Sequence, residues 1–269
     1  MATIQLDDLP LWYHEQGSPT GDPVVLLHSA FVDSRMFDVA LPHLDVHFRV
    51  LTFDRRAHGH TPDVGGPLSY ELMARDTIAF LERVVNGPAH LVGHSDGANV
   101  ALLVAMRRPD LVRKLVPISG NFHHEGLLPG VLEGFGEEDA LRYLGTNYGA
   151  VSPDGEQHFP TVVDKVLRMA GTQPTLTEAD LARITARTLV VAGDDDAMSL
   201  EHTVALYRAI PDAELAIVPR ASHLLVVERP AEVYGLVNTF LTTAEPPPPT
   251  RQPIRRARQV SQPDRSASR

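Results

Sequence analysis

The 269-residue sequence contains no cysteine, which excludes disulfides, thiolate metal sites and a cysteine nucleophile. Aromatic residues make up only 6%, with a single Trp, and no apolar run approaches the roughly 18 residues that a membrane-spanning helix needs. No basic segment followed by an apolar stretch stands at the start, so we expect a cytoplasmic protein without membrane contact. The nucleophiles that remain are chiefly Ser, Asp and Glu.

Positive charge is also scarce, and the net charge is −10. Residues 244–269 hold six Arg against two acidic residues, so residues 1–243 alone carry −14. Such an acidic body repels phosphate backbones, and nucleic acid is therefore not an expected partner. The Pro/Arg/Ser-rich segment 244–269 has almost no apolar residues to pack, and its composition predicts a disordered tail.

Short apolar runs that end in turn residues alternate with segments of helical spacing. Alternation of this kind predicts an α/β fold, a mostly parallel central sheet with helices on both faces. The expected strands are residues 24–28, 50–53, 90–93, 112–118, 188–192 and 215–218, and the clearest helices are residues 72–85 and 98–106.

The segment 120–185 contains nine glycines, and it interrupts this alternation with no strand-like run before a helical stretch at 162–169. An inserted helical cap explains this segment better than a second independent domain, and a cap could act as a lid over a site. We therefore expect core segments at 1–119 and 186–243, the cap at 120–185 and the tail at 244–269.

Gly93-His94-Ser95-Asp96-Gly97 fits the pattern G-x-S-x-G and stands between a strand-like and a helix-like run. In this context the pattern predicts a sharp turn that exposes the serine hydroxyl, with glycines where neighbouring chains come close. Ser95 is therefore the candidate nucleophile. Asp96 adds negative charge beside it and could attract a cationic group on a substrate.

A serine nucleophile needs a histidine base and an acid that orients the base. Among 13 histidines, His223 stands in the loop after the last expected strand, where parallel sheets carry their catalytic groups. Asp194-Asp195-Asp196 follows the preceding strand, and Asp196 is the expected acid. A cation site at these carboxylates is the alternative, but no calcium-loop spacing surrounds them, so we expect no metal.

Stabilising an oxyanion requires two donors. The backbone N–H of Asp96, directly after the nucleophile, is one, and the N–H of Ala30 in the loop after residues 24–27 is the expected second. Ser29 and Phe31 of this loop, with His123 and His124 at the start of the insertion, are candidate pocket residues. An ordinary loop position is the alternative for the two histidines.

Together with the stretch 53–61, which reads F-D-R-R-A-H-G-H-T, these motifs resemble the α/β-hydrolase family over about residues 3–243, in the chain order Ser, Asp, His. The resemblance implies Ser95 as nucleophile, His223 as base and acid, Asp196 as its orienter, and Ala30 with Asp96 as oxyanion donors. Ser29 and Ala57 depart from the pattern, because the family often has Gly there. A Ser at position 95 argues against the branches whose nucleophile is Asp.

We therefore expect a cofactor-independent serine hydrolase that acts on small carboxylic esters or lactones, with a small molecule as its partner. A C–C bond hydrolase, an amidase or aminopeptidase and a perhydrolase would use the same triad, since the cap and acyl pocket make that choice. A non-catalytic small-ligand receptor of the same fold is the alternative of a different class.

Overall fold

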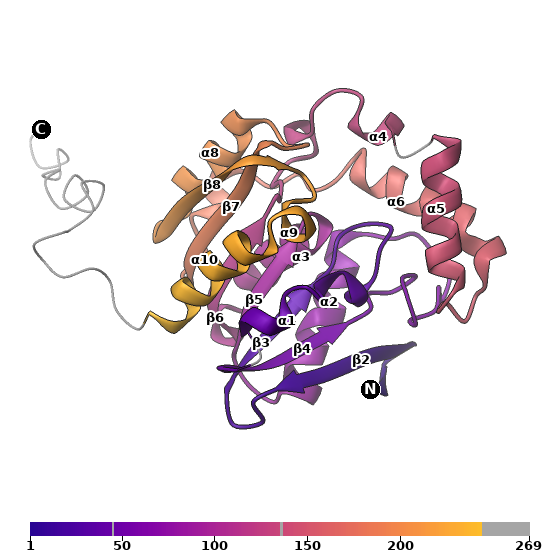
Figure 1. Ribbon diagram of the computed structural model, residues 1–269, viewed down its shortest axis with the longest axis horizontal. Helices are drawn as coiled ribbons and strands as arrows, with labels where there is room; N and C mark the ends of the chain where they lie inside the picture. The colour runs from indigo at the N-terminus through magenta and orange to yellow at the C-terminus, as the bar shows by residue number, and fades with distance from the viewer. Residues whose placement is uncertain (45, 135–136, 244–269) are drawn as a thin grey trace, which may run out of the picture.

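The computed structural model describes residues 1–44, 46–134 and 137–243. The tail predicted at 244–269 lies outside these residues. One eight-stranded sheet runs through the molecule with helices on both of its faces (Figure 1). This arrangement confirms the predicted fold class.

All six predicted strands are present, most of them longer than the apolar run that indicated them. The sheet also holds two N-terminal strands that were not predicted. The strands are β1 Ala2–Leu6, β2 Leu9–Gly17, β3 Asp22–Leu27, β4 Phe48–Phe53, β5 Ala89–His94, β6 Val112–Ile118, β7 Arg187–Asp195 and β8 Ala213–Ser222.

The strand order is β1-β2-β4-β3-β5-β6-β7-β8. Only the pairings of β1 with β2 and of β2 with β4 are antiparallel; the remaining pairings are parallel. The carboxyl ends of β5, β7 and β8 therefore meet at one edge of the sheet, where parallel α/β sheets place their ligand sites.

The helical elements comprise helices of eight residues or more and shorter helical turns. Ser69 caps the helix α2, Tyr70–Phe80, by accepting the N–H of Leu72. The helical elements are η1 Ser34–Phe37, α1 Leu41–Leu44, α2 Tyr70–Phe80, η2 Leu81–Val85, α3 Asp96–Arg107, η3 Pro109–Leu111, η4 His124–Gly126, α4 Val131–Gly134, α5 Glu138–Gly149, η5 Glu156–His158, α6 Phe159–Ala170, α7 Glu178–Leu181, α8 Leu200–Ala209, α9 Leu225–Glu228 and α10 Pro230–Thr242.

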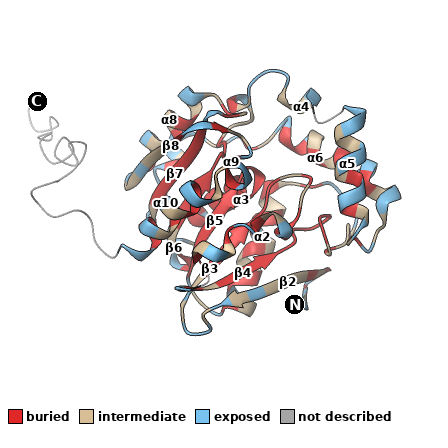
Figure 2. Ribbon diagram, in the orientation of Figure 1, coloured by how far each residue is buried: buried red, intermediate tan, exposed pale blue. Residues whose placement is uncertain are grey.

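Alternating side chains of each central strand enter two separate apolar cores. In β3, Val25 and Leu27 join the core under α2, α3 and α8, whereas Val24 and Leu26 join the core under α1, α9 and α10. Successive side chains of a strand point to opposite faces of the sheet, and each face is covered by one of the two cores (Figure 2). Because both faces are covered, the central parallel strands are continuous apolar runs in the sequence.

The segment between β6 and β7 carries η4, α4, α5, η5, α6 and α7. Its apolar side chains, among them Phe159 and Val166, join the core under α2 and α3. Its polar groups contact the loop after β4: Lys165 Nζ lies 2.6 Å from Asp63 Oδ2, and His158 Nε2 lies 2.8 Å from it. Among the described residues, no helix is long and apolar enough to cross a bilayer.

Candidate active site

Ser95 occupies the sharp turn between β5 and α3. Its backbone has φ 55° and ψ −119°, a conformation that costs a non-glycine residue energy and is typical of functional sites. The turn is held by the Ser95 N–H, which donates to Ile118 O at 2.9 Å, and by Ala98 N–H, which donates to Ser95 O at 2.8 Å. The predicted strand–turn–helix context is therefore present.

The two glycines of the turn are required by close backbone approaches. A Cβ at Gly93 would overlap Gly97 O, and a Cβ at Gly97 would overlap Leu27 O. Both obstacles are backbone atoms, which cannot move aside as a flexible side chain can. The G-x-S-x-G spacing thus follows from the packing of α3 against β3 and β5.

The structure brings Ser95, His223 and Asp196 together from three loops. His223 Nε2 lies 3.0 Å from Ser95 Oγ, and His223 Nδ1 lies 2.8 Å from Asp196 Oδ1. Ser95 and Asp196 are 7% and 8% exposed, so this chain of hydrogen bonds is largely shielded from water. The arrangement matches the geometry that lets a histidine remove the proton of a serine hydroxyl.

Of the three neighbouring carboxylates, Asp196 is the one that contacts His223. Asp194 Oδ1 instead accepts the N–H of Ala221 at 3.1 Å and joins β7 to β8, and Asp195 is exposed. Asp196 Oδ2 accepts hydrogen bonds from Ser119 Oγ and from Gly193 N–H. Burial raises the pKa of Asp196, but the bonds from His223 and Ser119 outweigh burial and the net pKa is lowered.

His94 contacts the backbone of the loop that carries His223. Its Nε2 lies 2.7 Å from His223 O, and because a carbonyl oxygen only accepts, Nε2 carries the proton. Burial lowers the pKa of His94 to about 3, so the ring is neutral and donates this bond across the physiological range. His94 therefore fixes the backbone at His223 without adding charge.

The loop that carries Ala30 is fixed by His28 and Arg55. His28 Nδ1 donates to Ser29 O at 2.7 Å, and His28 Nε2 accepts the N–H of Arg55 at 2.9 Å. The Arg55 guanidinium donates to the same Ser29 oxygen at 2.9 Å. These bonds hold Ala30 beside Ser95, and both residues line one cavity.

Backbone strain is present at Ala57, one of the two departures from glycine, and at Phe31 in the loop after β3. Ala57 is fully buried with φ 63°, and Phe31 has φ 61°, in the left-handed region that glycine occupies at little cost. Such a conformation costs a non-glycine residue roughly 1 kcal/mol. The fold therefore tolerates side chains at these turns at a modest loss of stability.

A cavity of about 40 Å³ is lined by Ser95 and His223. Its floor is polar, with Ser29, Tyr70, Asp96 and Asn121, whereas its other walls are mainly apolar. The apolar lining residues are Ala30, Phe31, Leu127, Val131, Leu132, Val166, Ala170 and Met198, most of them from the segment between β6 and β7 or from the loops beside it.

Two of the four predicted pocket residues line this cavity, and two do not. Ser29 and Phe31 are lining residues, whereas His123 and His124 are absent from the lining. The rings of the two histidines stack on each other at 4.6 Å, and the backbone of His123 bridges to Thr175. This bridge fixes the pair on the loop, so their prediction as pocket residues is corrected to the ordinary loop position.

Tyr70 and Asp96 form a buried pair at the cavity floor. Tyr70 Oη donates to Asp96 Oδ1 at 2.6 Å, and the two side chains are nearly inaccessible to water. Burial and the charge of Asp96 raise the pKa of Tyr70 well above its usual value, so the phenol stays protonated and remains a donor.

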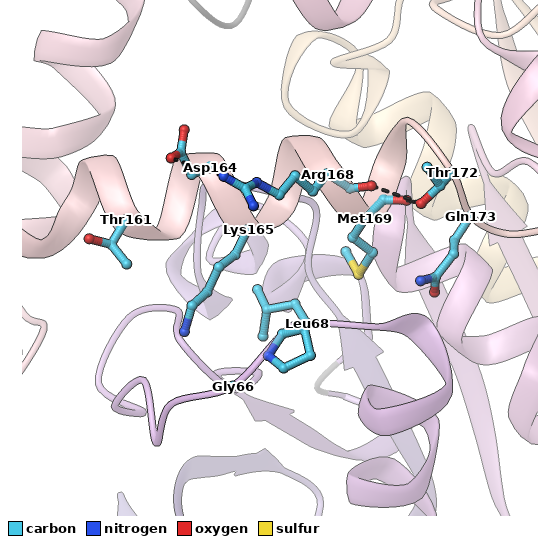
Figure 3. Close-up of a pocket in the computed structure, with 10 residues that line it drawn as sticks. Gly66, Leu68, Thr161, Asp164, Lys165, Arg168, Met169, Thr172 and Gln173 are labelled. Carbon is cyan, nitrogen blue, oxygen red and sulfur yellow. Dashed lines mark hydrogen bonds and ion pairs between the residues drawn. The ribbon is translucent and has the colours of Figure 1, made fainter.

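A larger groove of about 510 Å³ lies on the outer side of α6, between this helix and the loop at residues 66–68 (Figure 3). Lys165 and Arg168 line it, and Lys165 is already paired with Asp63. Ser95, Asp196 and His223 are not lining residues of the groove. The chemistry therefore belongs to the small cavity, although the groove is larger.

Sequence reasoning missed Ser119, Tyr70, Arg55 and His94 as supporting residues of the site. Arg55 lies in a motif that carried the family resemblance, and His94 lies within G-x-S-x-G, so a local signal existed for these two. Ser119 and Tyr70 contact partners 77 and 26 residues away, and no local pattern marks them.

Comparisons with known proteins agree with this geometry. Residues 24–236 match the model of a family described as the alpha/beta hydrolase family. A "Putative esterase/lipase" of Haemophilus influenzae is 23% identical over 256 residues, which cover 85% of this chain and 86% of that protein. The sn-1-specific diacylglycerol lipase ABHD11 of Mus musculus is 38% identical over 119 residues, 42% of this chain and 38% of that protein.

A solved structure gives the same fold over nearly the whole described chain. The enol-lactonase from Burkholderia xenovorans superposes with a TM-score of 0.73 at 20% sequence identity, covering 90% of this chain and 100% of that one. At this identity the likeness concerns the fold alone.

Proposed function

This chain belongs to the α/β-hydrolase family, and on that premise we propose that it is a cofactor-independent serine hydrolase of small carboxylic esters or lactones. The observation that carries the proposal is the continuous hydrogen-bond chain from Ser95 Oγ through the His223 ring to Asp196. A buried serine, histidine and carboxylate in this order are the groups that acyl transfer needs.

The first half-reaction would form an acyl-enzyme. His223 Nε2 takes the proton of Ser95 Oγ while the oxygen attacks the substrate carbonyl, and Asp196 stabilises the positive charge on the ring. The backbone N–H groups of Ala30 and Asp96 receive the oxyanion. Asp96 is the first residue of α3, and the first N–H groups of a helix have no acceptor within it.

The second half-reaction would return the free enzyme. It follows the collapse of the first tetrahedral intermediate, which breaks the bond to the alcohol, passes the His223 proton to that alcohol and leaves the acyl group on Ser95. A water then enters, and the ring takes a proton from that water as it attacks the acyl carbon. Collapse of the second tetrahedral intermediate releases the acid and gives the proton back to Ser95. The atoms balance with water as the only co-substrate, so the proposal needs no cofactor or metal.

We further propose that residues 120–185 act as a cap that selects the substrate. The cap side of the cavity includes Leu127, Val131, Leu132 and Val166. A cavity of about 40 Å³ holds only a few waters, since one water needs roughly 10–15 Å³ by the same measure. Substrate entry would therefore require the cap to move relative to the core.

Two of the relatives carry names that fit an ester substrate. The Haemophilus relative carries the name of an esterase/lipase, and the mouse relative that of a diacylglycerol lipase. Carboxylic esters are common to both names. The small cavity with its apolar walls favours a short acyl group over a long lipid chain.

Turnover of p-nitrophenyl esters from acetate to decanoate tests the proposal. We expect hydrolysis that is fastest for short acyl chains and that falls about 10⁴-fold or more in Ser95→Ala. Ser199→Ala, which removes a serine that caps α8, is the matched control and should keep its turnover. A folded wild type without turnover would contradict ester hydrolysis and favour C–C bond cleavage, an amide substrate or a ligand receptor.

A further inference from the structure

Asp96 presents an unsatisfied acceptor beside the nucleophile. Its side chain is 5% exposed, and the residue lines the cavity over Ser95. Oδ1 accepts from Tyr70, but Oδ2 is buried and has no hydrogen-bond partner among the described residues. A buried carboxylate oxygen without a donor is costly, so a native structure that retains one calls for an explanation.

The side chains around Asp96 do not supply the missing donor. The guanidinium of Arg55 is close enough for its charge to act on Asp96, but its hydrogen bonds go to Ser29 O and to Met73 Sδ. The amide of Asn121 donates to His123 O. The opposite walls of the cavity are apolar and have no side-chain donor to offer.

The position of Asp96 limits which part of a substrate could reach it. Its own backbone N–H is the proposed donor to the oxyanion, so its side chain starts two bonds from the nitrogen that would hold the carbonyl oxygen. A substrate group that meets this carboxylate therefore lies within a few bonds of the scissile carbonyl. The small cavity leaves room there for a compact acyl group only.

We propose that Asp96 is a specificity-determining residue that binds an N–H or O–H donor on the carbon next to the scissile carbonyl, as in an α-amino or α-hydroxy ester. The inference rests on the proposed ester hydrolysis and narrows its substrate class. The net charge of −10 favours the cationic donor, because an acidic protein attracts an ammonium group over long range.

The experiment compares three esters with one leaving group and acyl groups of nearly equal size. The benzyl esters of alanine, lactate and isobutyrate carry an ammonium, a hydroxyl and a methyl group at the same carbon. We expect kcat/KM of the wild type to be at least tenfold higher for a donor-bearing ester than for isobutyrate. A preference for the alanine ester alone would mean that the site recognises an ammonium group. A preference for both the alanine and the lactate ester would mean that it recognises any hydrogen-bond donor.

Two variants assign the preference to the carboxylate. Asp96→Asn should lower the ratio of the donor-bearing ester to isobutyrate at least tenfold, because it removes the charge and places a donor at one terminal atom. Ser199→Ala, the control variant used above, leaves the Asp96 carboxylate and its hydrogen-bond partner in place and should keep the ratio. The ratio cancels any general loss of activity that either variant suffers.

Three results would overturn the inference. Wild-type ratios within threefold of one would mean that no substrate donor is recognised, and this result needs no variant to fold. An unchanged ratio in Asp96→Asn, or an equal collapse in Ser199→Ala, would assign the preference elsewhere. Hydrolysis of isobutyrate without preference leaves the proposed function intact, whereas no hydrolysis of any ester overturns both.

Discussion

At the scale of single residues, Ser119 illustrates how much of the site lies outside the triad. Its hydroxyl donates to Asp196 Oδ2, opposite the oxygen that contacts His223. Ser119 itself is held in the left-handed region, φ 51°, and its N–H donates to Val191 O at 2.8 Å. A residue held in this way on the end of β6 fixes the rotation of the Asp196 carboxylate.

Ser119→Ala should reduce kcat about tenfold with little change in KM. A hydrogen bond to a charged group contributes about 1.5–3 kcal/mol, and the part that differs between ground and transition states sets the rate. Steady-state kinetics on a short p-nitrophenyl ester measures this effect. Thr177→Ala, which removes the N-cap of α7, should lose about 1 kcal/mol of stability at unchanged kcat. Equal kcat for Ser119→Ala and wild type would contradict the positioning role.

That Ser95, Asp196 and His223 lie together could be predicted because each follows an apolar strand and sits in a short recognisable motif. The support from Ser119 and Tyr70 could not, since each depends on a partner from a distant part of the chain. His123 and His124 show the opposite error. Two neighbouring histidines at the start of the insertion suggested a pocket, but a backbone bridge to Thr175 holds them elsewhere.

At the scale of elements, the turn between β5 and α3 is the feature that most constrains the site. Its two glycines are packed against backbone, and the strain at Ser95 is maintained by the bonds around it. This turn places the nucleophile and the first N–H groups of α3 on the same side. Any side chain at Gly97 would push α3 away from β3.

Gly97→Ala should destabilise the protein by about 3 kcal/mol or more and abolish turnover, because overpacking against a rigid neighbour is among the most damaging changes. Gly235→Ala in α10 is the matched control, since no atom lies within 4 Å of its added Cβ. Alanine there should stabilise the helix by up to about 1 kcal/mol. Chemical unfolding of both variants measures these changes in stability. A Gly97→Ala variant as stable as the wild type would refute the packing argument.

The strands differ in how readily the sequence indicates them. The five strands β3 to β7 are largely buried and read as apolar runs, which is why they were predicted. The edge strand β8 is only partly buried, but residues 215–218 still form a short apolar run. The two missed strands, β1 and β2, lie at the antiparallel edge and mix polar with apolar residues. Their alternation of polar and apolar residues is a weaker signal than an apolar run, and they join the sheet through the pairings of β1 with β2 and of β2 with β4.

At the scale of the whole molecule, buried histidines couple stability to pH. Burial lowers the pKa of His58 and His94 to about 3 and that of His90 to about 4, whereas an unfolded chain binds these protons near 6.5. The unfolded state therefore binds more protons as the pH falls below about 6.5. Stability is fully present above that pH and decreases below it.

The free energy of unfolding should fall by about 1 kcal/mol for each of these histidines between pH 7 and 5.5. Urea unfolding at the two pH values measures the difference. Asp63 and Asp196 have lowered pKa values, so their protonation changes the free energy of unfolding only below about pH 4 and not between pH 7 and 5.5. Equal stability at both pH values would mean that the buried rings take up protons in the folded state.

The central claim, an acyl-enzyme on Ser95, is tested most directly by rapid acid quench of the protein mixed with p-nitrophenyl acetate, followed by peptide mass analysis. The account predicts one acetyl group per chain, on the peptide that contains Ser95, and none in Ser95→Ala. Turnover without an acylated peptide, or with acetyl on a different residue, would contradict it.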